Sequence, residues 1–196
     1  MSVATKAPAS QQRLLNVPNQ LTVLRLLLSL VLFVLIALEY YLTGMAVFIV
    51  AASTDWLDGY WARKYGQVTN LGRILDPFVD KIIVCGTFIF LAAVPHSGVQ
   101  AWMAVLIVGR ELLVTALRSY LEGEGADFSA VMSGKLKMAV QCVAAAISLY
   151  ALSLGAPGER PAALQWSLDI SVWAAVLLTI YSGAAYVRRA VILLGR

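Results

Sequence analysis

Residues 55–80, DWLDGYWARKYGQVTNLGRILDPFVD, place four aspartates in a chain that is otherwise largely apolar. Asp55 and Asp58 are three residues apart. Asp76 and Asp80 are four apart, so each pair would project from one face of a helix. An aspartate inside a membrane costs about 2.5–3.5 kcal/mol on insertion scales, so four of them need neutralising partners. The pattern therefore predicts a site for divalent cations.

The residues between the two pairs leave room for a ligand. Gly59 follows Asp58 directly and exposes backbone where a ligand can approach closely, and Ala62 lies one turn further on. Arg63 offers a planar fork of donors that suits phosphate, and Gly72 precedes the second pair. We therefore expect a phosphate-bearing ligand beside the cations.

The composition indicates a membrane protein. Of the 196 residues, 60% are hydrophobic and 13% are charged, against about 25% charged in an average soluble domain. The apolar runs are continuous rather than alternating, which favours helices over a barrel. A span takes about 20 residues, so the length allows roughly six. The predicted fold is an all-α integral membrane protein with six transmembrane helices.

The apolar runs predict where these helices lie. Residues 1–12 are expected to form a flexible tail, and 13–196 a single membrane domain. A short amphipathic helix is expected at the interface from residue 13 to 17, broken at Pro18. The expected spans are 21–42, 45–63, 76–94, 99–120, 134–154 and 164–194. If the third helix begins earlier, Pro77 falls inside its first turns, and the sequence leaves both starts open.

The basic residues predict the orientation. With the N-terminus inside, 14 of the 15 Lys and Arg residues fall on the cytoplasmic side, and only Arg160 lies outside. This asymmetry places both termini and both aspartate pairs at the cytoplasmic face. The basic residues are spread over four inside segments, which argues against binding of nucleic acid. His96 lies in an outer loop, too far from the aspartates to be their catalytic base.

The remaining polar residues suggest a second candidate site. Cys85 and Cys142 have no spacing typical of a disulfide or zinc site. An Arg and a Glu stand in the middle of the fourth span and could simply neutralise each other. Alternatively, basic residues on the fourth and fifth spans could bind a second anionic ligand; these are Arg110, Arg118, Lys135 and Lys137.

The aspartate stretch resembles the full signature of the CDP-alcohol phosphotransferase family, Asp55-x-x-Asp58-Gly59-x-x-Ala62-Arg63, eight residues, then Gly72-x-x-x-Asp76-x-x-x-Asp80. All eight defining positions are present at the family's spacing. The resemblance implies a two-metal site for Mg²⁺ or Mn²⁺. It implies that Asp55, Asp58 and Asp76 bind the metals, and that Asp80 touches metal and takes the proton from the acceptor hydroxyl. It also implies that the CDP group is held by Asp58, Gly59, Ala62, Arg63 and Gly72.

Three further stretches resemble the bacterial branch of this family that joins CDP-diacylglycerol to glycerol 3-phosphate. They are NVPNQLTVLR at 16–25, GREL at 109–112 and GKLK at 134–137. The implied activity is transfer of a phosphatidyl group to sn-glycerol 3-phosphate, with release of CMP. The implied setting is the bacterial inner membrane, with the active site facing the cytoplasm. Small residues at 144–146 and 183–185 permit close packing of helices and could serve the contact of a homodimer, although packing within the bundle explains them equally well.

Two kinds of alternative stay open at this point. Another member of the family, such as a phosphatidylinositol-phosphate, cardiolipin or phosphatidylserine synthase, would carry the same aspartates. A divalent-cation transporter would also hold carboxylates within its spans. Against the transporter, all four aspartates lie at one face, and nothing comparable continues across the bilayer. No Ser, Cys or His suits a covalent intermediate, so direct displacement is expected for an enzyme.

Overall fold

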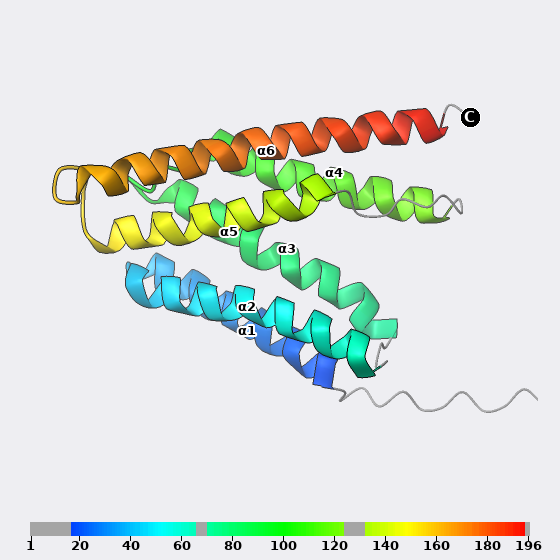
Figure 1. Ribbon diagram of the computed structural model, residues 1–196. Coiled ribbons are helices and arrows are strands. Elements are labelled where there is room, and N and C mark those ends of the chain that lie inside the picture. The colour runs from blue at the N-terminus through cyan, green and yellow to red at the C-terminus, as the bar shows by residue number, and fades with distance from the viewer. Residues whose placement is uncertain (1–16, 66–69, 124–131, 195–196) are drawn as a thin grey trace, which may run out of the picture.

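The computed structural model describes residues 17–65, 70–123 and 132–194, and these ranges are helical apart from three connecting loops (Figure 1). The six helices within them are α1 (Val17–Ala37), α2 (Tyr41–Tyr65), α3 (Asn70–Ala93), α4 (Ala101–Gly123), α5 (Met132–Ser153) and α6 (Ala162–Leu194). The described part of the chain contains no strand, so the predicted all-α class is confirmed there.

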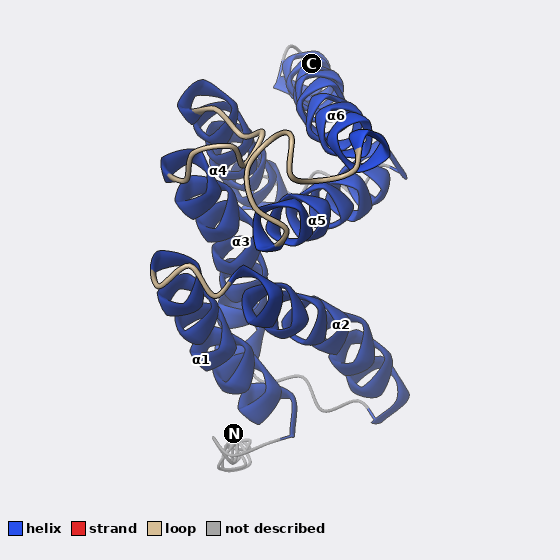
Figure 2. Cartoon of the chain, turned by 90° about the vertical axis from the view of Figure 1, so that its left-hand side faces the viewer, coloured by secondary structure: helices blue, strands red, loops and turns tan. Residues whose placement is uncertain are grey.

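The helices pack as one bundle with α3 near its centre, where it contacts α1, α2, α4 and α5. Helix α1 contacts α2 and α3, and α5 contacts α2 and α6. Helix α4 contacts α3 and α6. The three described loops all lie at the end of the bundle that faces the viewer in Figure 2. The first turn of α1 and the last turn of α6 both lie at the opposite end (Figure 1), as an even number of antiparallel passes requires.

A large apolar core runs between the helices. Its fully buried members include Leu32 of α1, Phe48 of α2, Phe88 of α3 and Leu149 of α5. Phe33 of α1 stacks on Phe90 of α3 with ring centroids 4.9 Å apart. Helix α3 therefore packs against α1 through large aromatic side chains.

The outer surface of the bundle is apolar, as expected of a protein that lies in a membrane. Large apolar side chains face outward along several helices, among them Val105, Leu112, Trp166 and Ile170. Within the described ranges, two stretches are long and apolar enough to cross a bilayer, Leu136–Ser153 and Ala162–Leu193. Shorter apolar runs occupy Thr22–Ala37, Tyr41–Ser53 and Lys81–Ala93. A soluble domain would hide most of this surface, so contact with lipid explains it best.

The boundary between the first two helices differs from the prediction. We expected the first span to reach Leu42, but α1 ends at Ala37 and α2 begins at Tyr41. Glu39 adopts a left-handed backbone (φ 63°), and the amide of Tyr40 donates to the carbonyl of Leu35 (2.9 Å). This is the hydrogen-bonding pattern of a helix C-terminus, where glycine is the usual residue. Because no glycine marks this turn in the sequence, the predicted end of the first helix falls too late, at Leu42.

The helices that contain Pro18 and Pro77 also begin at other residues than the sequence predicts. Helix α1 already includes Val17 and Pro18, so the prediction that the chain breaks at Pro18 is wrong. Proline is compatible with a first turn because its missing N–H has no partner there in any helix. Helix α3 begins at Asn70, which settles the open choice of start and places Pro77 inside the helix. Residues 1–16, which include the predicted tail and most of the interfacial helix, lie outside the described residues.

Candidate functional site

The aspartate signature spans the two helices that flank residues 66–69. Asp55 and Asp58 lie on α2, and Asp76 and Asp80 lie on α3. The same two helices carry Gly59, Ala62, Arg63 and Gly72. Helices α2 and α3 contact each other, and both are helical at the signature, as the spacing predicted. The side chains of this signature lie outside the described residues, so the predicted metal and nucleotide contacts stay predictions.

A cluster of charges joins α4 to α5 beside this signature. The carboxylate oxygen Oε1 of Glu111 accepts a hydrogen bond from Nη1 of Arg110 (3.0 Å) and another from Nζ of Lys137. Lys137 is only 3% exposed. One carboxylate thus serves two cations, so the simple picture of a self-neutralising Arg–Glu pair does not describe this cluster. Among these three side chains, one positive charge is left in excess.

A second contact connects the cluster to α3. Nζ of Lys81 donates to Oγ1 of Thr115, whose hydroxyl donates to the backbone carbonyl of Glu111 (2.7 Å). Lys81 follows Asp80 directly in the sequence. The helix that carries Asp76 and Asp80 is therefore tied by a polar side chain to the helix that carries Arg110.

Helix α6 closes the cluster from a third side. The guanidinium carbon of Arg110 lies 5.3 Å from the centroid of the Tyr186 ring, a distance at which a cation is attracted to the ring face. One turn before Tyr186, Gly183 faces the stem of Arg110: a Cβ atom built there would lie 3.2 Å from Cγ of Arg110. The side chain of Arg110 is thus placed by α4, α5 and α6 together.

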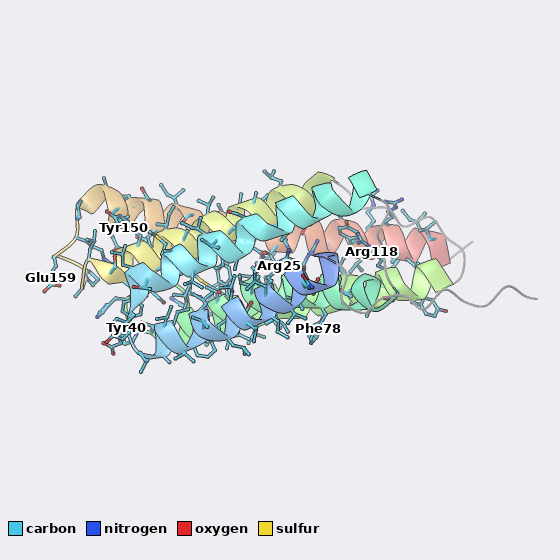
Figure 3. The ribbon with its side chains drawn as sticks, turned by 90° about the horizontal axis from the view of Figure 1, so that it is seen from below. Arg25, Tyr40, Phe78, Arg118, Tyr150 and Glu159 are labelled. Carbon is cyan, nitrogen blue, oxygen red and sulfur yellow. The ribbon has the colours of Figure 1, made fainter. Side chains whose placement is uncertain are left out.

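Two other basic side chains lie toward the same end of the bundle. Arg25 of α1 is 1% exposed, and Arg118 of α4 is half-buried two turns beyond Arg110. Figure 3 shows both on the side of the molecule away from Tyr40 and Glu159. Cationic side chains from α1, α3, α4 and α5 therefore gather in the half of the bundle that carries the aspartates.

The opposite end of the bundle holds a separate polar contact. Nη2 of Arg160 donates to the backbone carbonyl of His96 (3.0 Å), which joins the loop before α6 to the loop before α4. The hydroxyl of Ser148 donates to the carbonyl of Ser97 in the same loop (2.7 Å). His96 is exposed at this end, so the structure keeps it far from the aspartate signature, as the sequence predicted.

The predicted acceptor residues divide into three groups. Arg110 and Lys137 are brought together through Glu111. Arg118 lies on the same helix as Arg110, two turns further along. The side chain of Lys135 lies outside the described residues. Sequence reasoning missed Lys81, Thr115, Gly183 and Tyr186, because their roles depend on which helices pack together.

The chemistry of the aspartate set suits hard divalent cations. Carboxylate oxygens are the ligands that Mg²⁺ and Mn²⁺ prefer, whereas zinc and copper sites rely on Cys and His. Among the side chains that the structure describes, no three of His, Cys, Asp or Glu come together as metal ligands. The four aspartates of α2 and α3 thus remain the candidate ligands for such an ion.

Comparison with known proteins places the chain in one family. Residues 15–181 match the CDP-alcohol phosphatidyltransferase family. A CDP-diacylglycerol–glycerol-3-phosphate 3-phosphatidyltransferase of Bacillus subtilis is 35% identical over 187 residues, covering 87% of this chain and 93% of that protein. The Rickettsia typhi protein of the same description is 35% identical over 175 residues, covering 87% and 94%. A probable phosphatidylglycerophosphate synthase of Mycobacterium tuberculosis is 37% identical over 190 residues, covering 93% and 85%.

Proposed function

The chain belongs to the CDP-alcohol phosphatidyltransferase family, and from this premise we propose that it transfers the phosphatidyl group of CDP-diacylglycerol to sn-glycerol 3-phosphate. The products are phosphatidylglycerophosphate and CMP. The relatives described above, which the chain matches over most of their length, support glycerol 3-phosphate as the acceptor. Family membership also favours a transferase over the divalent-cation transporter.

The observation that carries the choice of acceptor is the buried cluster around Glu111. Arg110 and Lys137 share that one carboxylate, so the cluster keeps excess positive charge within the bundle. A phosphate monoester carries close to two negative charges near neutral pH and needs several fixed donors in a partly dehydrated site. An uncharged alcohol or serine would gain little from these cations. We therefore assign Arg110 and Lys137, with Arg118 and Lys135, to the acceptor phosphate.

The aspartates would perform the chemistry. Asp55, Asp58 and Asp76 would hold two Mg²⁺ or Mn²⁺ ions, with Asp80 as a further ligand. Bound divalent ions neutralise the pyrophosphate and stabilise the departing CMP. Asp80 would take the proton from the acceptor hydroxyl as its oxygen attacks the phosphorus that carries diacylglycerol. The bond between that phosphorus and the CMP oxygen then breaks.

The other signature residues would bind the nucleotide. Arg63 offers two parallel N–H donors to a phosphate of the CDP group. Gly59, Ala62 and Gly72 would let that group lie close to the backbone of α2 and α3. Because the substrate is a lipid and the acceptor is soluble, we place this site at the cytoplasmic surface of a bacterial inner membrane. The homodimer stays a prediction from the sequence.

An acceptor panel tests the proposal. The purified full-length protein is given CDP-diacylglycerol in mixed micelles with Mg²⁺, and CMP release is measured with glycerol 3-phosphate, glycerol, serine or inositol phosphate. We expect rapid release only with glycerol 3-phosphate, and its loss when EDTA removes the metal. Efficient use of serine or inositol phosphate instead would refute the acceptor and leave the family reaction intact. Cation uptake into liposomes without CDP-lipid would support the transporter.

A further inference from the structure

Helix α6 carries no residue of the signature, yet it supplies the surface on which Arg110 rests. The Tyr186 ring lies under the Arg110 guanidinium at 5.3 Å and is itself only 2% exposed. A ring face attracts a cation and favours one orientation of the guanidinium plane. An exposed tyrosine would be free to turn away, whereas this one is fixed.

Three helices hold the Tyr186 ring in place. It packs in a small apolar cluster with Val114 and Leu121 of α4 and Ala190 of α6. Its hydroxyl lies against α5, since a Cβ built on Gly134 would be 3.3 Å from that oxygen. Gly183 allows the close approach of α6 to the stem of Arg110, because any larger side chain would press on Cγ.

The orientation matters because one edge of the guanidinium is unused. Nη1 of Arg110 donates to Glu111, whereas Nε and Nη2 are buried and have no hydrogen-bond partner among the described residues. The N–H bonds of Nε and Nη2 run parallel along one edge of the plane, and this fork matches two oxygens of a phosphate. Buried donors without partners are rare in native proteins and indicate a ligand or another unseen partner.

From these contacts we infer that Tyr186 and Gly183 are positioning residues that aim the Nε/Nη2 edge of Arg110 at the acceptor's phosphate. The inference rests on the proposed function, because it takes the phosphate from the acceptor. Tyr186 touches neither substrate. It acts through Arg110. Replacing Tyr186 therefore lowers the affinity for a phosphorylated acceptor and changes no other step of the reaction.

Steady-state kinetics of the full-length protein test the inference. Replacing the ring in Tyr186→Leu is expected to raise KM for glycerol 3-phosphate by about threefold to tenfold, as loss of a partly buried cation–π contact would. KM for CDP-diacylglycerol and kcat are expected to change by less than about twofold. Tyr186→Phe keeps the ring face, so its KM for glycerol 3-phosphate should be close to that of the wild type. Tyr181→Leu is the matched control, because Tyr181 lies on the same helix and is 66% exposed.

A double-mutant cycle shows whether Tyr186 acts through Arg110. In an Arg110→Gln background, which removes the charge but keeps much of the side chain's volume, Tyr186→Leu should raise the acceptor KM no further. If the two substitutions raised the acceptor KM independently, so that their effects multiplied, the inference would be overturned. An equal rise in KM for both substrates would also overturn it, because Tyr186 would then be a structural residue. Gly183→Ala should reproduce the acceptor-specific rise, because it displaces the Arg110 stem.

The acceptor panel separates failure of this inference from failure of the proposed function. If the wild-type protein prefers another phosphorylated acceptor, the cycle is repeated with that acceptor, and an acceptor-specific rise still supports the positioning role. If the wild-type protein prefers an acceptor without a phosphate, both the inference and the proposed acceptor are wrong. If glycerol 3-phosphate is preferred and Tyr186→Leu leaves its KM unchanged, only the inference is wrong.

Discussion

At the scale of single residues, the roles assigned here follow from how charge is shared. Glu111 accepts from Arg110 and from Lys137, so neither cation is cancelled by a partner of its own. Removing one member of a buried charged cluster generally costs several kcal/mol, because it leaves the others uncompensated. Substitutions that keep volume and remove only charge are therefore the informative ones in this site.

The proposed base gives the sharpest prediction at this scale. Asp80→Asn keeps the size of the side chain but cannot accept the acceptor's proton, so turnover should fall by at least about a hundredfold. Binding of CDP-diacylglycerol should stay close to that of the wild type, because the three other aspartates are expected to hold the metals still. Turnover is measured as CMP release, and binding is measured by equilibrium binding of labelled CDP-diacylglycerol.

Asp58→Asn serves as the comparison for this variant. Asp58 is proposed as a metal ligand that also contacts the nucleotide, so its loss should weaken both metal dependence and CDP-lipid binding. Substantial turnover by Asp80→Asn at saturating Mg²⁺ would show that another group takes the proton.

At the scale of helices, close approaches depend on glycines whose partners lie far away in the sequence. A Cβ built on Gly86 of α3 would lie 2.2 Å from Cζ of Phe33 on α1, which is closer than atoms can approach. Phe33 is held in turn by stacking on Phe90. The α1–α3 contact, and with it the position of the helix that carries Asp76 and Asp80, therefore requires glycine at this position.

A substitution at Gly86 tests this dependence. Gly86→Ala should force Phe33 from its place and destabilise the protein by about 1–3 kcal/mol, the usual cost of overpacking. Thermal unfolding in detergent measures the loss. Gly109→Ala is the control, since a Cβ there meets nothing within 4 Å and alanine favours a helix. An equal or greater loss of stability in the control would show that the Phe33 contact is not the cause.

At the scale of the whole molecule, the bundle has two chemically different ends. Arg25 and Arg118 lie toward one end, and Glu159 and Tyr40 lie at the other (Figure 3). The three described loops at the second end contain one Lys or Arg residue, Arg160, which is buried and donates to the backbone of His96. Since basic residues are retained on the cytoplasmic side, the end with the aspartates is expected to face the cytoplasm.

Cysteine labelling tests this orientation. In a variant lacking Cys85 and Cys142, a cysteine placed at Gln67 should react with an impermeant reagent only from the cytoplasmic side. A cysteine placed at Gly158, which is exposed in the loop before α6, should react only from outside. Labelling of the Gln67 position from outside would reverse the orientation and separate the aspartates from cytoplasmic CDP-lipid and acceptor.

The sequence alone determined the class of fold, the position of the signature and the family. Continuous apolar runs leave helices as the simplest solution, and the spacing of the aspartates is a local property that survives any arrangement of those helices. Helix ends were less predictable. The turn at Glu39 has a left-handed residue without glycine, and Pro77 is accommodated inside α3, so in both places the local preference was overridden by the rest of the fold.

Only the tertiary structure decided how the charged cluster around Glu111 is built. Glu111 could have neutralised Arg110 alone, and nothing in the sequence says that Lys137 of α5 reaches the same oxygen. Likewise, Gly183 and Tyr186 look like ordinary packing residues until α6 is placed against α4. The physical reason is that contacts between helices depend on side-chain packing across the whole core, whereas periodicity and spacing record only what each helix presents along its own length.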